Sequence, residues 1–462
     1  MSRSRPSGML TDTELRKLVG AGEIDTVLAV FPDLYGRLVG KRYDASFYCD
    51  HVAAHGMHAC DYLLACDMEM DPVPGYRFAS WQQGYGDVRC VPDVATLRRA
   101  SWLERTALVL CDVCAEPDGA PVSVAPRNIL KRQLERAAAA GYVAMGASEL
   151  EFFILRETYE SAHAKGFDRL ATAGWFIEDY HTLQGFKVEG LVGAIRRHAA
   201  ASGIPVESSK GEWGPGQQEL NLQYTQLLEM ADRHVIYKQA AKEIAIQQGA
   251  AVTFMAKYDE QLAGSSMHVH SSLWRDGGRT AAFDAPAPAA GGLPDLCRWW
   301  LGGLMHHAAA CALLFAPYVN SYKRFRAGSF APTAIAWAHD NRTAGFRIVG
   351  QGSSLRVECR IPGADANPYL AFAATLAAGL DGIAQRIEPP PRFDGDAYGA
   401  ADLPRIPTSL PAAIDAFEAS PLFHTAFGAE VVEHLVHFAR TEQRKFDETV
   451  TTWERRRFLE RA

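Results

Sequence analysis

The hydrophobic pattern divides the chain into a short and a long part. Residues 26–31 are almost entirely apolar, as in a buried strand, and residues 38–41 begin a return strand after turn residues. This segment predicts a β-hairpin. The turn-rich run 116–121 then marks a domain boundary. We therefore expect an N-terminal domain at residues 11–115 and a larger domain at residues 122–462.

Helical and strand periods both occur in the longer part. Apolar residues recur at helical spacing on one face of residues 126–140. Further helices are predicted at residues 187–202, 231–248, 296–315 and 367–386. Strands are predicted at residues 143–155, 217–224, 252–256, 266–274 and 354–361. This mixture predicts an α+β fold.

Four of the predicted strands carry polar side chains at alternate positions. Side chains alternate between the two faces of a strand, so Glu149 and Glu151 point to the same side. The same alternation places on one face His268 and His270, then Glu219, Asn221 and Gln223, and then Arg356, Glu358 and Arg360. A solvated outer surface is the commoner setting for one such strand. A single sheet curved around a polar interior accounts for all four with one assumption.

Convergence of these faces would gather several carboxylates and a histidine, and Glu212 could join them from a loop that contains Gly214 and Gly216. Carboxylates packed so closely cannot all stay ionised without cations. Oxygen-dominated ligands favour Mg²⁺ or Mn²⁺ over zinc. Two or more such cations beside arginines indicate phosphoryl transfer. The candidate arginines are Arg324, Arg342, Arg347, Arg356 and Arg360.

Composition and motifs exclude several other classes. The 462 residues carry a net charge of -7 and no basic run, so no nucleic-acid partner is expected. No apolar stretch is long enough to span a bilayer. The N-terminus lacks the apolar core of a signal peptide, and the nine cysteines are scattered, as in a cytoplasmic protein. No P-loop, nucleophile elbow or zinc-protease motif occurs, so metals and arginines must handle the phosphate.

Six short motifs occur in the order found in the glutamine synthetase family, which the chain resembles over nearly its whole length. They lie at residues 149–151, 212–219, 267–270, 320–324, 341–342 and 356–360, and residues 364–370 read as the family's closing segment. The resemblance implies an N-terminal β-grasp domain and a catalytic domain with a curved antiparallel sheet. It also implies stacked rings of subunits with active sites at the subunit interfaces.

The resemblance assigns roles to individual residues. One metal would be held by Glu151, Glu212 and Glu219, and the other by Glu149, His268 and Glu358. The residues that would bind glutamate are Gly264, Arg324 and Arg360. The residues that would bind ATP are Tyr224, His270, Ser272, Arg342, Arg347 and Arg356. For Tyr224 the alternative is ordinary packing at a strand end. The catalytic groups would be Arg342 and Glu212.

The chain departs from the family where ammonium would bind. Glutamine synthetases carry Gly-x-Glu-Ala-Pro at this point, whereas residues 328–332 read Gly-Ser-Phe-Ala-Pro. Phe330 can neither bind an ammonium ion nor take its proton. It can pack against the carbon chain of an organic amine, or it can simply fill space in the loop. Ala263 also replaces an asparagine that contacts glutamate in the family.

These departures resemble the branch that makes γ-glutamylpolyamines and γ-glutamylethanolamide. The resemblance implies an ATP-dependent ligase that joins L-glutamate to an organic primary amine, a polyamine or ethanolamine, through γ-glutamyl phosphate. Two alternatives remain: a glutamine synthetase that uses ammonia, and an inactive regulatory paralogue. Retention of all six expected metal ligands argues against the second alternative.

Overall fold

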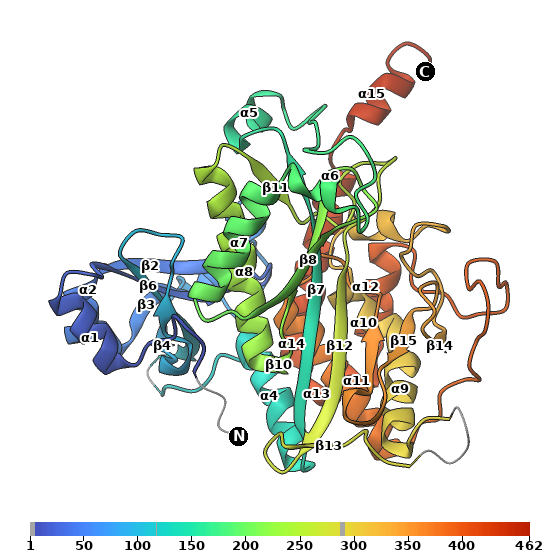
Figure 1. Cartoon of the computed structure of the whole chain (residues 1–462), viewed down its shortest axis with the longest axis horizontal. Helices are drawn as coiled ribbons and strands as arrows, with labels where there is room; N and C mark the ends of the chain where they lie inside the picture. The colour runs from blue at the N-terminus through green and yellow to red at the C-terminus, as the bar shows by residue number, and fades with distance from the viewer. Residues whose placement is uncertain (1–4, 117, 287–291) are drawn as a thin grey trace.

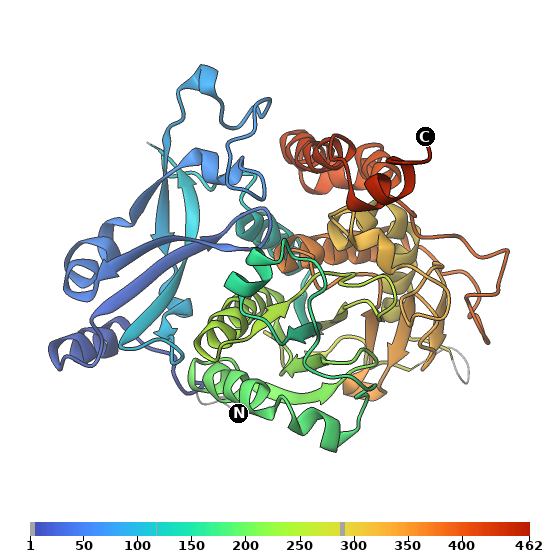
Figure 2. The same ribbon diagram turned by 90° about the horizontal axis from the view of Figure 1, so that it is seen from above.

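Two β-sheets organise the molecule, one from each part of the chain. The computed structural model describes residues 5–116, 118–286 and 292–462. The first sheet has six strands and the second has ten. The N-terminal sheet lies to one side of the larger sheet and its helices in both views (Figures 1 and 2).

The first sheet has the order β2-β1-β6-β4-β3, and β5 pairs with β6. Strands β1 and β2 form the predicted antiparallel hairpin, whereas β1 and β6 run parallel. This is the arrangement of a β-grasp fold. The strands are β1 (Thr26–Pro32), β2 (Leu38–Asp44), β3 (Met57–Cys60), β4 (Asp87–Pro92), β5 (Arg98–Arg99) and β6 (Thr106–Ala115). The helices of this part are α1 (Asp12–Gly20), α2 (Ala45–Phe47) and α3 (Ala53–His55).

The first sheet ends at Ala115, and the next helix begins at Pro126. We propose that residues 116–121 form the domain boundary, as their turn residues predict. Residue 117 within this run lies outside the described residues.

The second sheet has the order β14-β15-β16-β12-β7-β9-β8. The four strands predicted to share a polar face are therefore consecutive neighbours, β16-β12-β7-β9. Their pairings are antiparallel, while β14 and β15 at the edge run parallel. The strands are β7 (Val143–Leu155), β8 (Val206–Gly211), β9 (Gln217–Leu222), β10 (Thr225–Gln226), β11 (Ala251–Thr253), β12 (Met267–Arg275), β13 (Thr280–Ala281), β14 (Trp337–His339), β15 (Phe346–Val349) and β16 (Arg356–Cys359). The predicted fold class is confirmed.

Helices cover the apolar face of this sheet. Helices α4, α8 and α9 contact it, and α11 packs behind all three. They are α4 (Pro126–Ala139), α8 (Leu227–Gln247), α9 (Asp295–His306) and α11 (Pro368–Gln385). Leu150 and Phe152, which alternate with the two glutamates of β7, are buried on this side. The opposite face remains free to line a polar cavity.

The remaining helices lie around this core. They are α5 (Tyr159–Ala164), α6 (Thr182–Phe186), α7 (Glu189–Ala201), α10 (Ala308–Phe315), α12 (Leu410–Glu418), α13 (Pro421–Ala426), α14 (Ala429–Asp447) and α15 (Thr452–Phe458). The single helix predicted at residues 296–315 is two helices, α9 and α10. They break at His307, whose Nε2 lies 2.8 Å from a carboxylate oxygen of Asp381 on α11. Within the described part of the chain, no helix has the length and apolarity needed to cross a membrane.

A candidate two-metal active site

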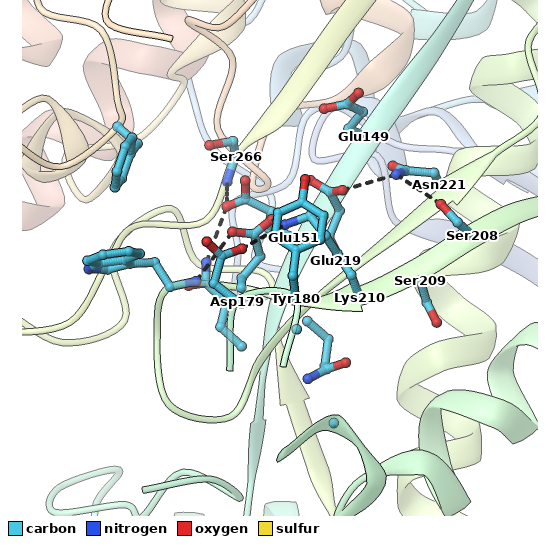
Figure 3. A pocket seen from close by; sticks show the side chains of 18 of the residues that line it. Glu149, Glu151, Asp179, Tyr180, Ser208, Ser209, Lys210, Glu219, Asn221 and Ser266 are labelled. Atoms are coloured by element: carbon cyan, nitrogen blue, oxygen red, sulfur yellow. Dashed lines mark hydrogen bonds and ion pairs between the residues drawn. The ribbon is translucent and has the colours of Figure 1, made fainter. Parts of the chain in front are cut away.

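The polar face of the second sheet lines a cavity of about 1030 Å³. Glu149, Glu151 and Glu219 project into it from neighbouring strands, with Asn221 and Ser266 beside them (Figure 3). The other predicted site residues on its wall are Glu212, Gly264, His268, Phe330, Arg342, Arg347 and Arg360. The structure thus brings together most residues that the sequence singled out.

Strand register explains how these side chains meet. Glu151 lies directly opposite Glu219, and Glu149 lies opposite His268 on the other neighbouring strand. On the next strand pair, Glu358 lies opposite His270. Directly opposed residues on one face have Cβ atoms about 5 Å apart, so the sheet itself sets the spacing of the ligands.

The first cluster is Glu151, Glu212 and Glu219, whose nearest carboxylate oxygens lie within 4.8 Å of one another. Burial and the neighbouring Glu212 raise the pKa of Glu151 to about 8. Burial and the charges of Glu149, Glu212 and Glu151 raise the pKa of Glu219 to about 9. Glu151 and Glu219 need a cation to stay ionised at neutral pH, and the all-oxygen donor set of the cluster fits Mg²⁺ or Mn²⁺.

The second cluster differs in one member from the predicted set. Ligand atoms of Glu149, His270 and Glu358 lie within 4.8 Å of one another. The predicted ligand His268 lies in the same place, with Nδ1 at 3.1 Å from Glu149 and 3.5 Å from Glu358. Both histidines therefore face the same two carboxylates. His270, predicted at the ATP site, is near enough to bind this metal as well.

The protonation of this cluster suits a metal. Burial and the charge of Arg360 lower the pKa of His268 to about 4, so its ring is neutral and can bind a cation. Its Nε2 atom is buried without a hydrogen-bond partner in the described structure. Burial opposes ionisation of Glu358, but His268, His270 and Arg360 lower its pKa to about 2.

Arginines surround the second cluster on one side. Nη1 of Arg360 donates a hydrogen bond to Glu358 at 2.6 Å, and Nη1 of Arg347 donates to the same carboxylate at 2.9 Å. Arg356 donates through Nε to Nδ1 of His270 at 3.2 Å. Arg342 is exposed at the cavity wall. Positive groups thus lie beside the second cluster, where they could share the charge of a phosphoryl group.

Arg324 lies behind this wall, at the end of the 3₁₀ helix Ser321–Arg324. It is buried and donates to the hydroxyl of Ser266 at 3.2 Å and to the carbonyl of Ile361. Gly264 lies against it, since a Cβ atom there would come within 2.9 Å of Arg324 Cδ. Its carbonyl accepts a hydrogen bond at 3.0 Å from Gln217.

Two predicted ATP contacts lie away from the clusters. The ring of Tyr224 stacks near Trp274, with centroids 6.4 Å apart. The hydroxyl of Ser272 accepts a hydrogen bond from the same indole at 3.0 Å. Neither residue lines the cavity. Their contact with a nucleotide stays a prediction.

Several residues of the site escaped sequence reasoning. Lys210 forms an ion pair with Glu212 and lies 3.5 Å from Asp179 (Figure 3). Lys210 lies two residues before Glu212, so strand alternation could have placed the two side chains on the same face. Glu178 is fully buried and accepts hydrogen bonds from the backbone N–H of Gly216 at 3.1 Å and from Gln218 at 2.6 Å. It comes from an irregular loop, which gives no periodic signal.

The site holds two adjacent groups of candidate cation ligands, an arrangement that suits phosphoryl transfer. Residues 123–458 match the glutamine synthetase catalytic domain. The chain belongs to the glutamine synthetase family, as its motifs predict.

Two relatives and one solved structure illustrate its neighbours in that family. The chain is 49% identical over 459 residues to gamma-glutamylethanolamide synthetase GlnA4 of Streptomyces coelicolor, covering 99% of this chain and 97% of the relative. It is 34% identical over 450 residues to the glutamate–isopropylamine ligase of a Pseudomonas species, covering 97% of each. The GmaS/ADP complex has a TM-score of 0.83 at 30% identity, covering 97% of this chain and 99% of that chain.

Proposed function

We propose that the protein is an ATP-dependent ligase that forms a γ-glutamylamide from L-glutamate and an organic primary amine. The observation that carries this is the combination of two metal-ligand clusters with Phe330 on the wall of the same cavity. The phosphoryl-transfer half of the site is retained, while the ammonium-binding carboxylate of the family is replaced by a phenyl ring. One relative is named for making an ethanolamide and another for ligating isopropylamine, and both names support this function.

The first step activates glutamate. An oxygen of its γ-carboxylate forms a bond to the γ-phosphorus of ATP, and the bond from that phosphorus to the ADP oxygen breaks. Bound cations, Mg²⁺ or Mn²⁺ and two or more per site, would neutralise the charge of the phosphoryl group. We propose that Arg324 and Arg360 hold the glutamate carboxylates, and that Arg342 and Arg347 face the phosphates.

The second step forms the amide. The lone pair of the amine nitrogen attacks the γ-carbonyl carbon of γ-glutamyl phosphate, the carbon–oxygen bond to phosphate breaks, and inorganic phosphate leaves. The nitrogen then loses a proton, and we propose Glu212 as its acceptor. The acid anhydride makes a good leaving group from a poor one, which is why ATP is needed.

Membership of the glutamine synthetase family also supports assembly of the protein into a homo-oligomer. We propose that subunits form stacked rings with active sites between neighbours. Light scattering of the purified protein should give the mass of a large homo-oligomer. A monomer that is fully active would contradict this assembly.

The decisive experiment measures amide formation with ammonia, ethanolamine, isopropylamine and putrescine under equal conditions, with product identified by mass spectrometry. We expect organic amines to exceed ammonia in kcat/KM. Higher kcat/KM with ammonia would favour an ordinary glutamine synthetase. A folded protein without metal-dependent product from any amine would favour an inactive paralogue.

A single substitution tests the role of Phe330. Phe330→Glu supplies the carboxylate that an ammonium ion needs, so the ratio of ammonia to organic-amine turnover should rise, by about tenfold or more. Phe330→Leu is the matched control, because it changes the ring without adding a charge. An unchanged ratio in a folded Phe330→Glu protein would remove Phe330 from the acceptor site.

A further inference from the structure

A second aromatic ring lies beside Phe330. Trp213, which directly follows Glu212, meets Phe330 edge-on, with ring centroids 5.4 Å apart and planes at 62°. Both residues line the cavity, from two loops far apart in the sequence. Edge-to-face contact of this kind is a favoured arrangement of aromatic rings.

Both rings remain open on one side. Trp213 is 47% exposed and Phe330 is 46% exposed, although aromatic side chains usually bury most of their surface. Apolar surface in a cavity is stabilised when an apolar part of a ligand covers it. The pair therefore offers a contact surface to the acceptor rather than a filled core.

The backbone of Phe330 adopts an unusual conformation. Its φ of 59° lies in the left-handed region that bulky residues avoid. Its carbonyl accepts a hydrogen bond at 3.4 Å from Nη2 of Arg360, whose Nη1 binds Glu358. The backbone of Phe330 is thus hydrogen-bonded to Arg360, a residue of the predicted glutamate site.

Two carboxylates on the cavity wall, those of Glu212 and Glu189, pair with basic side chains. Lys210 pairs with Glu212 and also lies 3.5 Å from Asp179, so one positive charge is shared by two carboxylates. Glu189 on the cavity wall pairs with Arg196 at 2.5 Å. Glu207 on β8 also lines the cavity, and its Cα atom lies no more than roughly 16 Å from that of Glu212.

We propose that Trp213 is a specificity-determining residue, which forms with Phe330 an apolar wall that contacts the carbon chain of the acceptor amine. Because burying a charge against an apolar wall is costly, the site takes short primary amines whose chain carries no second positive charge. This inference rests on the proposed ligase function and adds the chemical class of the acceptor to it.

The test uses the full-length enzyme and a homologous series of ammonia, methylamine, ethylamine and propylamine. Each methylene that packs on the wall should raise kcat/KM about fourfold. Trp213→Ala should flatten this series and lower the propylamine-to-ammonia ratio by about tenfold or more. Trp213→Phe keeps an aromatic surface and should preserve most of the slope. The KM for glutamate, measured in the same variants, reports whether the rest of the site is intact.

The possible outcomes distinguish a failure of this inference from a failure of the proposed ligase function. The inference is overturned if kcat/KM rises equally with each added methylene in Trp213→Ala and in the unchanged enzyme. The ligase function would then still stand. Higher kcat/KM for 1,3-diaminopropane than for propylamine overturns the requirement for an uncharged chain. Absence of amide from every amine overturns both the function and the inference.

Discussion

Gly264 leaves no room for a side chain. A Cβ atom there would lie 2.8 Å from the carbonyl oxygen of Ala256 and 2.9 Å from Arg324 Cδ. Both distances are shorter than normal contacts, and Arg324 is packed too tightly to yield. Even alanine at this position must therefore displace the arginine.

We expect Gly264→Ala to raise the KM for glutamate about tenfold to a hundredfold, because a small shift of a positioning group is costly. Steady-state kinetics with glutamate varied would measure this. Gly190→Ala is the control, since a Cβ atom there meets nothing within 4 Å and Ala favours a helix. An unchanged KM in Gly264→Ala would show that Arg324 does not hold glutamate.

The raised pKa values of Glu151 and Glu219 link stability to pH and metal. Both carboxyls bind protons more tightly in the folded protein than in the unfolded chain, where the ordinary pKa is 4.5. The folded state without metal is thus favoured below that value, and this contribution is lost as pH rises toward about 8 and 9. A bound cation stabilises the ionised carboxylates and so offsets this loss of folding stability at higher pH.

We therefore expect the rise in Tm caused by Mg²⁺ or Mn²⁺ to be larger at pH 8 than at pH 6, as measured by scanning calorimetry. Lys238 is buried with its pKa lowered to about 7 and acts in the opposite sense, so the comparison needs a variant. Glu151→Gln, which does not titrate, should show a weaker dependence of the metal effect on pH. Equal metal effects at both pH values would contradict this linkage.

At the scale of elements, Glu178 fixes two loops against each other. Its carboxylate holds the backbone of Gly216 and the side chain of Gln218, and its own backbone N–H donates to the carbonyl of Glu212 at 3.3 Å. A Cβ atom at Gly211 would come within 2.7 Å of Glu178 Cβ, so the two segments pack tightly. The loop that carries Glu212 depends on this contact.

Glu178→Ala should weaken Mn²⁺ binding about tenfold to a hundredfold, the usual effect of losing a residue that orients metal ligands. Isothermal titration calorimetry on the folded variant would measure the affinity. Glu260→Ala removes an exposed carboxylate and should bind Mn²⁺ like the unchanged protein. Equal affinities in the two variants would mean that Glu178 has no part in ordering the site.

The strands with polar faces could be predicted because alternation is a local property. The sequences of β7 and β12 alone predict which side chains share a face, because alternation does not depend on the neighbouring strands. It could not distinguish His268 from His270 as the metal ligand, since both lie on one face and their distances to Glu149 and Glu358 arise from register. Strand β8 was missed because its exposed residues Glu207 and Ser208 interrupt the alternation.

At the scale of the whole molecule, a buried arginine joins the two parts of the chain. Arg127 on α4 is 2% exposed and forms ion pairs with Asp93 and Asp112 of the N-terminal part and with Asp232 of α8. The nitrogen–oxygen distance to Asp93 is 2.7 Å and that to Asp232 is 2.9 Å. These partners come from three distant segments, so no local pattern predicts the cluster.

Arg127→Met should destabilise the protein by about 3–5 kcal/mol, because three carboxylates would lose a buried counter-charge. Chemical denaturation followed by circular dichroism would measure the change. Arg16→Met removes a surface arginine that pairs with Asp12 and should leave the unfolding midpoint unchanged. Similar midpoints for both variants would contradict a structural role for the Arg127 cluster.

The candidate metal ligands lie mainly on strands, whereas the proposed acceptor residues lie in loops. This difference affects how such an enzyme can change its substrate. In the proposed phosphoryl-transfer half, every candidate metal ligand except Glu212 lies on a strand, where a shift of one residue in register would turn it into the core. The proposed acceptor half, Trp213 and Phe330, lies in loops that can change without moving a strand. We therefore expect that natural or engineered changes in residues 328–332 can alter which amine is used while the metal ligands on the strands stay the same.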